Sequence, residues 1–513
     1  MAHLSRSGAL AGALLAAVAL LGASPAAASS PVPSRCEALT ARLAGELTDV
    51  VCFESTDLTT QNDATTPADN SLPGLPAFAF TPRTDRGVIA PSAAKRPPIA
   101  RAVPGVQLQA RFAGDPTGQG RFLLRLPDGW NGRLVVAGAS GTRSEFNGDF
   151  AWSDFVLQQG YAYASQNKGV LNLRLVGVSA TPPAADPLAC RLNPASPVWV
   201  HFYDNDADQP FTRWAETMAH AAAVARRGAG VHYGRSPRHT YAVGTSNGGY
   251  QVRRAVESYP HLFDGGVDWE GTYVDAGVPN LLSDLPPAVL NYPDYVASGH
   301  DPASTAARNI AAAGYPPDLT ATSPSLWDRY SGSFWEVTAC QWQKRLDPGY
   351  DTYGSGVGGY NYVARLSTSD VAAGLSAFAT TGRIRRPLIT LAGTMDGLLP
   401  IDRHARAYAR KVRAWSEEQE RGRGRGRGRE DDGDGRPVPY RLYEVQNAGH
   451  IETYADVHPE IELLMPHAQR AFELLVQSVE HGAALPPDQC VPRGGAISSA
   501  PAQPGHCARL LEP

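Results

Sequence analysis

The sequence predicts an α/β protein with a mostly parallel central sheet, helices on both faces of that sheet and an inserted cap. From residue 134 to about 271, short apolar runs rich in β-formers alternate with segments of helical periodicity. This alternation stops between 272 and 385 and resumes at 387. Parallel strands that are buried on both faces appear as continuous apolar runs, and Leu134-Val135-Val136 is such a run.

Length and composition predict one large globular unit with an insertion. The chain has 513 residues, of which 43% are hydrophobic and 19% charged. Its formal net charge is −4 and its pI is near 6.4. A chain with this balance lacks the basic surface typical of proteins that bind nucleic acid or anionic membranes, so neither is an expected partner.

The N-terminus has the pattern of a secretory signal. Arg6 precedes an apolar run over 9–21, which Pro25 and three alanines follow. We expect a signal peptide over 1–28 with cleavage after Ala28, because the apolar run is too short to span a bilayer comfortably. The mature protein is then extracellular, free of the membrane and open to disulfide formation.

Six cysteines remain after this cleavage, and an even number in an exported chain favours disulfides over thiolate ligation of a metal. Six cysteines allow fifteen pairings. Proximity along the chain suggests Cys36–Cys52 and Cys490–Cys507, which leaves Cys190–Cys340.

The remaining chain divides by composition and periodicity. We expect an irregular N-terminal segment over 29–110, the first part of the core over 111–271 and the cap over 272–385. The second part of the core follows over 386–485, with a disordered Arg-Gly and acidic loop at 417–436, and a tail covers 486–513. The cap is rich in Trp and Tyr. Most of these aromatic side chains should form its own core, and some should line the entrance to a site.

Each expected element has a local reason. Alternating apolar residues over 107–126 indicate antiparallel strands, and apolar runs indicate strands over 134–138, 161–165, 241–243, 387–393 and 440–445, the last of the sheet. A further strand ends within 263–271. Apolar residues at helical spacing predict helices over 155–160, 212–227, 403–415 and 461–481.

The segment Gly244-Thr245-Ser246-Asn247-Gly248 joins the strand at 241–243 to a helical pattern. Strand, Gly-x-Ser-x-Gly and helix together predict a nucleophile elbow, in which the serine occupies a strained turn. The glycines leave room for strand and helix to approach, and the helix N-terminus places N–H groups beside the Ser246 hydroxyl. A merely flexible glycine-rich loop is the alternative.

A serine hydroxyl needs a base, and that base needs a carboxylate to orient it. In the α/β-hydrolase fold the order along the chain is Ser, Asp, His, each after a strand. Ser246, Asp396 and His450 satisfy this order. Most competing histidines and aspartates lie in helical patterns, in the cap or away from a strand end; these are His232, His239, His261, His404, His458, Asp370 and Asp402. Two aspartates near the strand after the elbow, Asp264 and Asp268, are the serious rivals.

Backbone donors for an oxyanion are expected at two places. One is the N–H of Asn247, which follows the nucleophile. The other is the loop after 134–138, where Ser140 and Gly141 lie; an ordinary turn explains this loop equally well.

No motif indicates a cofactor or a metal. The run from Asp204 to Asp208 begins like a calcium loop, but Gln209 and Ala215 occupy the positions where glycine and glutamate are required. We therefore expect an acidic surface loop there, with calcium as a minor alternative.

Five stretches of the chain resemble the tannase and feruloyl esterase family of secreted α/β-hydrolases. They are the elbow residues, Tyr259-Pro260, 263–266, Ala392 to Asp396 and Asn447 to His450. They are also similar to the extracellular 3-hydroxybutyrate-oligomer hydrolases. The resemblance covers roughly 134–271 and 387–481 and implies hydrolysis of carboxylic esters. Family members typically place cysteines before the serine and after the histidine, whereas Thr245 and Ile451 stand here. No disulfide can join the two triad residues, which puts a tannin or feruloyl substrate in doubt.

Two other functions remain open. A Ser-Asn-Gly-Gly elbow also occurs in prolyl-oligopeptidase-like peptidases, although the repeats of a propeller are not visible in the residues before 134. A non-catalytic protein that binds a polymer on its aromatic cap is the alternative from another class. The substrate of the expected enzyme is a small-molecule or oligomeric ester.

Overall fold

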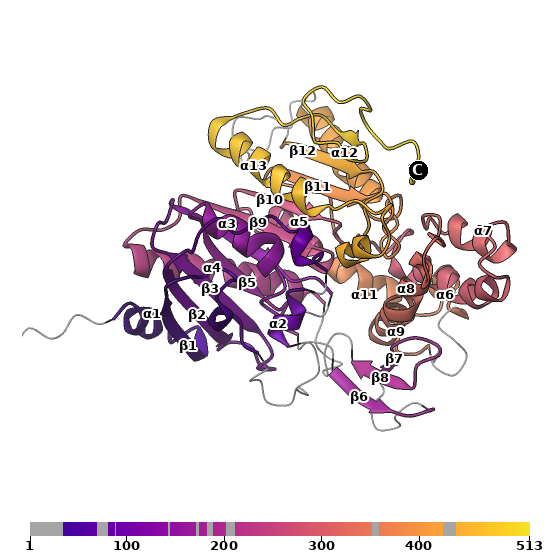
Figure 1. Cartoon of the computed structure of the whole chain (residues 1–513), viewed down its shortest axis with the longest axis horizontal. Helices are drawn as coiled ribbons and strands as arrows, with labels where there is room; N and C mark the ends of the chain where they lie inside the picture. Colours follow the sequence, from indigo (N-terminus) through magenta and orange to yellow (C-terminus); the bar gives the residue numbers. More distant parts are fainter. Residues whose placement is uncertain are drawn as a thin grey trace, which may run out of the picture.

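The computed structural model describes residues 34–68, 81–87, 89–141, 144–170, 174–181, 188–201, 211–350, 359–423 and 438–512. Figure 1 shows an α/β body with a helical cap on its right-hand side. Within these residues, a ten-stranded sheet runs through the body in the order β1-β2-β3-β5-β4-β9-β10-β11-β12-β13. Its strands are β1 (Leu47–Ser55), β2 (Gly105–Phe112), β3 (Arg121–Pro127), β4 (Arg133–Gly138), β5 (Ala162–Gln166), β9 (His239–Thr245), β10 (Gly265–Trp269), β11 (Leu388–Gly393), β12 (Tyr440–Val445) and β13 (Gln489–Val491).

The sheet is antiparallel at its N-terminal edge and parallel beyond it. β1, β2, β3 and β5 pair antiparallel, and every pair from β5 to β13 is parallel. β4, β5 and β11 are buried on both faces, as the apolar runs predict.

Alternate residues of each strand face two separate cores. On one face, Leu134 and Val136 pack with α1 (Arg35–Leu43), α4 (Arg213–Tyr233), α5 (Asn247–Ser258) and α12 (Ala405–Arg423). On the other, Val135 and Ala137 pack with α3 (Asp154–Gln158) and α13 (Met465–His481). Helices on both faces of a mostly parallel sheet, with an elbow between β9 and α5, make this an α/β-hydrolase fold.

The cap lies between β10 and β11 in the chain and consists of helices around an aromatic core. The helices are α6 (Leu281–Ala297), α7 (Thr305–Ala312), α8 (Leu326–Ser333), α9 (Trp335–Leu346), α10 (Tyr362–Arg365) and α11 (Val371–Phe378). Trp335 is central to this core, with its ring centroid 5.3 Å from that of Tyr315 and 5.7 Å from that of Tyr292. Most cap aromatics therefore stabilise the cap itself, and Phe334 lines the cavity described below.

A small sheet joins the cap from outside the expected cap boundaries. β6 (Arg174–Val178), β8 (Val198–His201) and β7 (Cys190–Arg191) form an antiparallel sheet in the order β6-β8-β7. Cys190 and Val200 pack in the same apolar cluster as the cap helices, and Figure 1 shows these strands beneath α9. The boundaries expected from the sequence place this segment in the first part of the core, because strands of two to five residues have too little periodicity to reveal their partners.

Both ends of the described chain add strands where we expected none. The N-terminal segment, expected to be irregular, forms α1, the edge strand β1 and the short helix α2 (Pro82–Asp85). The tail contributes β13, so the strand at 440–445 is not the last. The α12 helix continues to Arg423, beyond the predicted end at 415, because Glu, Gln and Arg favour helix there. The signal segment 1–28, the Asp204–Asp208 run and the Arg-Gly residues 424–436 lie outside the described residues.

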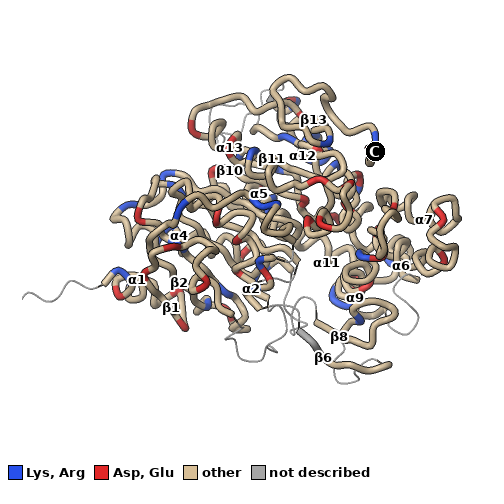
Figure 2. The backbone as a smooth tube through the Cα atoms, viewed as in Figure 1, with Lys and Arg blue, Asp and Glu red and all other residues tan. Residues whose placement is uncertain are grey.

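The three disulfides are those that chain proximity suggested: Cys36–Cys52, Cys190–Cys340 and Cys490–Cys507. They join α1 to β1, the small sheet to α9, and β13 to the C-terminal segment. Charged residues of both signs are interspersed over body and cap, as Figure 2 shows. None of the helices in the described part of the chain combines the length and apolar character needed to cross a bilayer.

Candidate active site

Ser246 occupies a sharp turn between β9 and α5. Its backbone has φ 59° and ψ −121°, a combination that non-glycine residues rarely adopt. The turn is held because the Ser246 N–H donates to the Trp269 carbonyl at 2.9 Å. A Cβ on Gly244 would lie 2.5 Å from the Gly248 carbonyl, and one on Gly248 would lie 2.5 Å from the Gly138 carbonyl. Only glycine therefore allows this close approach of strand, helix and neighbouring strand.

His450 and Asp396, which are 54 positions apart in the chain, form a buried pair. The His450 Nδ1 lies 2.8 Å from the Asp396 Oδ2. The Asp396 Oδ1 accepts the backbone N–H groups of Leu398 and Leu399 at 2.8 and 2.7 Å. Each side chain of the pair is only 2% exposed. Two backbone N–H groups fix one oxygen of this carboxyl group and leave the other facing His450, where it can orient the imidazole.

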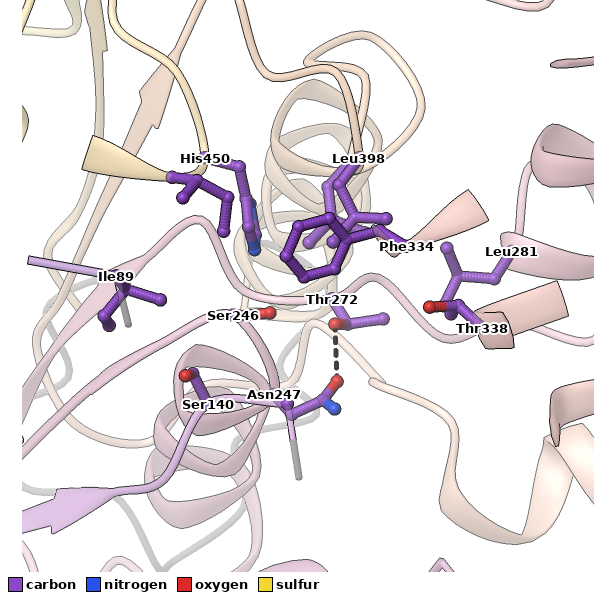
Figure 3. Close-up of a pocket in the computed structure, with 13 residues that line it drawn as sticks. Ile89, Ser140, Ser246, Asn247, Thr272, Leu281, Phe334, Thr338, Leu398 and His450 are labelled. Atoms are coloured by element: carbon purple, nitrogen blue, oxygen red, sulfur yellow. Dashed lines mark hydrogen bonds between the residues drawn. The ribbon is translucent and has the colours of Figure 1, made fainter. Parts of the chain in front are cut away.

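Ser246 and His450 line one cavity at the junction of the body and the cap (Figure 3). The cavity holds about 510 Å³ of free space including its mouth. Its lining consists of Ile89, Ser140, Gly141, Ser246, Asn247, Thr272, Leu281, Phe334, Thr338, Leu398, Leu399, His450 and Ile451. Among these described lining residues, none is acidic and none is lysine or arginine. Ile89, which comes from the N-terminal segment, was not anticipated from the sequence.

The expected oxyanion donors all line this cavity, but they are not equivalent. Asn247 is the first residue of α5, so its N–H lies at the positive end of the helix dipole. The Ser140 N–H donates to the Asn147 Oδ1 at 3.1 Å and is therefore already used. Gly141, the next residue of that loop, also lines the cavity.

The rival histidines and aspartates have other partners. The His404 Nδ1 accepts the Tyr273 N–H at 3.0 Å, and the His458 Nδ1 lies 2.9 Å from the Thr322 hydroxyl. Asp268 pairs with Arg253 in the core, with 2.6 Å between Oδ2 and Nε. Asp264 accepts the Thr240 N–H at 2.8 Å. None of them lines the cavity described above.

Sequence reasoning did not consider Glu270, an acidic residue beside His450. It follows β10 directly, and its Oε2 lies 3.6 Å from the His450 Nδ1. Burial, together with the nearby Asp396 carboxylate, raises the pKa of Glu270 well above its usual range. The signal available in the sequence was its position at the end of a parallel strand, where we weighed only Asp264 and Asp268.

Glu270, Asp396 and His450 are also the group of described residues whose ligating atoms lie close enough to hold one metal ion, all within 4.8 Å of one another. The hydrogen bond to Asp396 requires a proton on the His450 Nδ1, and a protonated nitrogen cannot ligate a metal. The geometry fits a histidine flanked by two carboxyl groups better than a metal site.

Comparisons with known proteins were made for both the sequence and the structure. No family model matches the chain. Mono(2-hydroxyethyl) terephthalate hydrolase of Piscinibacter sakaiensis is 29% identical over 150 residues, which are 28% of this chain and 22% of that protein. The chain therefore matches less than a quarter of the length of this relative.

Among solved structures, feruloyl esterase B from Aspergillus oryzae is 12% identical with a TM-score of 0.46, over 88% of this chain and 90% of that chain. An esterase from the same fungus is 15% identical with a TM-score of 0.45, over 88% and 90%. Tannin acyl hydrolase from Aspergillus niger is 13% identical with a TM-score of 0.45, over 87% of each chain. A feruloyl esterase, a further esterase and a tannin acyl hydrolase are thus among the proteins that this chain is similar to.

Proposed function

We propose that the protein is an exported serine hydrolase of carboxylic esters that acts through an acyl-enzyme on Ser246. The observation that carries this proposal is the placement of Ser246, on its strained elbow, in the same cavity as a histidine whose far side is bonded to a buried aspartate. Nucleophile, base and orienting carboxylate then have the roles that acyl transfer requires. The three disulfides and the N-terminal signal pattern support export.

In the proposed reaction, the Ser246 Oγ attacks the ester carbonyl carbon while its proton passes to the His450 Nε2. The tetrahedral oxyanion accepts hydrogen bonds from the N–H groups of Asn247 and Gly141. His450 then protonates the leaving alkoxide, and the alcohol departs. Water, deprotonated by His450, attacks the acyl-enzyme, and the carboxylic acid leaves with Ser246 restored. Asp396 keeps the imidazole in the required tautomer throughout.

The cavity lining supports neutral, compact esters as substrates. Apolar side chains surround Ser246 from both sides, namely Ile89, Leu281, Phe334, Leu398, Leu399 and Ile451. No lysine or arginine among the lining residues can pair with a free carboxylate on the substrate. We therefore propose that neutral alkyl or aryl esters are preferred to a substrate that carries a carboxylate, such as mono(2-hydroxyethyl) terephthalate.

Short-chain nitrophenyl esters test the proposal. The mature chain from residue 29 is compared with Ser246→Ala and with Ser258→Ala, a matched change at an exposed serine of the same helix. We expect Ser246→Ala to lower kcat by at least about 10³-fold, and Ser258→Ala to leave it unchanged. An active-site serine reagent should label Ser246 in the wild type.

Two results would contradict the ester hydrolase. Absence of both turnover and labelling would favour a protein that binds a polymer without catalysis. Labelling of Ser246 together with cleavage of amides in preference to esters would favour a peptidase.

A further inference from the structure

The Glu270 side chain has no part in the proposed triad, although it lies against it. Its Oε2 is 3.6 Å from the His450 Nδ1, on which Asp396 also converges. The side chain is 1% exposed. A carboxyl group buried beside a catalytic base affects the charge that this base can carry.

The backbone fixes Glu270 in this position. Its φ is 51°, in the left-handed region that a residue with a long side chain rarely adopts. The Glu270 N–H donates to the Leu391 carbonyl at 2.8 Å, and the Gly393 N–H donates to its Oε1 at 2.9 Å. One bond to β11 therefore holds the Glu270 backbone, and a second bond to β11 holds its Oε1 and leaves its Oε2 facing His450.

Unequal hydrogen bonding separates the two carboxyl groups. Asp396 accepts two backbone N–H groups and the imidazole Nδ1–H, whereas Glu270 accepts one backbone N–H and its Oε2 has no hydrogen-bond partner among the described residues. Their facing oxygens lie within 4.8 Å of each other. Two carboxylates this close in a dry site do not both ionise, and Glu270, which has fewer hydrogen bonds, is the one whose pKa burial raises.

The other titratable groups near Glu270 reinforce this arrangement. Glu452, after β12, is fully buried, and burial raises its pKa to about 8. Tyr330 of the cap lies within electrostatic range of both Glu270 and Asp396. Neither supplies a positive charge that would stabilise a second carboxylate.

We propose that Glu270 is a second positioning carboxyl for His450. It is neutral while Asp396 carries the charge, and it is able to ionise and accept the Nδ1–H when the Asp396 charge is removed. The proposal rests on the proposed function, because it gives His450 the role of catalytic base. A merely structural role, in which Glu270 only ties β10 to β11, makes different predictions.

The test combines Asp396→Ala and Glu270→Gln, alone and together, in nitrophenyl butyrate hydrolysis. Alanine is used at 396 because it adds no amide that could donate to Nδ1 and impose the wrong tautomer; for the same reason the double variant is repeated with Glu270→Leu in place of Glu270→Gln. We expect about a 3-fold loss of kcat for Glu270→Gln and about a 100-fold loss for Asp396→Ala. The double variant should lose about 10⁴-fold, the usual loss when no carboxylate remains, which exceeds the product of the single losses.

The pH profile and the imidazole proton give independent readouts. In Asp396→Ala, kcat should rise with pH as Glu270 loses its proton, and this rise should be absent from the double variant. The His450 Nδ1–H resonance should persist in the NMR spectrum of Asp396→Ala and disappear in the double variant. Glu452→Gln, a matched change at a neighbouring buried glutamate, should cause no further loss in the Asp396→Ala background.

Multiplicative losses, or an unchanged Nδ1–H resonance in the double variant, would overturn the proposal. If Glu270→Gln does not fold, Glu270→Leu removes the same carboxyl group. Failure of the proposed function is a separate result, since it would appear as a wild type without Ser246-dependent turnover or labelling.

Discussion

Lys168 is buried beside the loop that follows β4. Its Nζ donates to the carbonyls of Ala139 and Ser140 at 3.1 and 3.0 Å. The Ser140 carbonyl belongs to the same peptide group as the Gly141 N–H. Because a trans peptide holds these two groups in opposite directions, an ammonium on the carbonyl directs the N–H away from Lys168 and increases its polarity.

Lys168→Met should therefore lower kcat by about 10- to 100-fold with little change in KM, because the lost interaction is needed mainly when the oxyanion forms. Ester kinetics measure this. Lys344→Met is the matched control, since Lys344 donates to the Ala189 carbonyl, away from the cavity. An unchanged kcat in Lys168→Met, with a change only in thermal stability, would contradict a role in the oxyanion site.

A disulfide links the cap to the small sheet, which lies far from the cap in the chain. The Cys190–Cys340 disulfide spans 150 positions and ties the small sheet to α9, whereas the other two span 16 and 17. The cap supplies Leu281, Phe334 and Thr338 to the cavity, so its position relative to Ser246 determines the shape of the site.

Replacing Cys190 and Cys340 by serine should cause the largest loss of stability among the three disulfides. Loop-closure entropy assigns this bridge about 5 kcal/mol and the shorter ones about 3 kcal/mol each. The melting temperatures of the three double-serine variants measure the order. We also expect KM to rise in the Cys190/Cys340 variant alone, and an equal rise in the Cys490/Cys507 variant would show that the cap is not the cause.

Several carboxyl groups are buried without a cationic partner close enough to keep them ionised. Burial raises the pKa of Glu452 to about 8, and those of Glu145 and Asp284 to about 7 each. The folded protein thus holds these protons more tightly than the unfolded chain, in which a glutamate titrates near 4.5. Their contribution to stability is complete below about pH 4.5 and is lost as the pH rises towards 8.

Glu452→Gln removes the titration of this buried carboxyl group. The free energy of unfolding of the variant should therefore fall less between pH 5 and pH 8 than that of the wild type. Each pH unit over which only the folded protein keeps the proton accounts for about 1.4 kcal/mol of the difference. The isosteric amide can still accept the Met465 N–H, which Glu452 accepts at 2.6 Å. Urea unfolding at the two pH values measures the difference. Glu418→Gln, at an exposed position of α12, is the control, and an equal effect there would exclude burial as the cause.

The sheet, the elbow and the order of Ser246, Asp396 and His450 could be predicted from the sequence. Buried parallel strands are apolar throughout, helices show a period near 3.6, and strand ends in this fold converge on one edge. These signals are local, and chain order completes the argument. The region of the site could therefore be located without knowledge of any tertiary contact.

Other features depend on contacts between distant segments. The strands of the small sheet and β13 have five residues or fewer, too few to show a period of their own, and are defined by the strands beside them. The Ser140 N–H donates to the Asn147 side chain, a contact that no sequence pattern indicates. Ile89 reaches the cavity from a segment without a recognisable motif.

Glu270 shows this division most clearly. Its residue type and its place after β10 are visible in the sequence, but its protonation depends on burial and on Asp396, more than a hundred positions away. Periodicity and chain order determined the sheet and the expected triad, because those patterns are local. The environment of each charge was decided only by the tertiary structure, because the energy of a buried charge depends on which groups surround it.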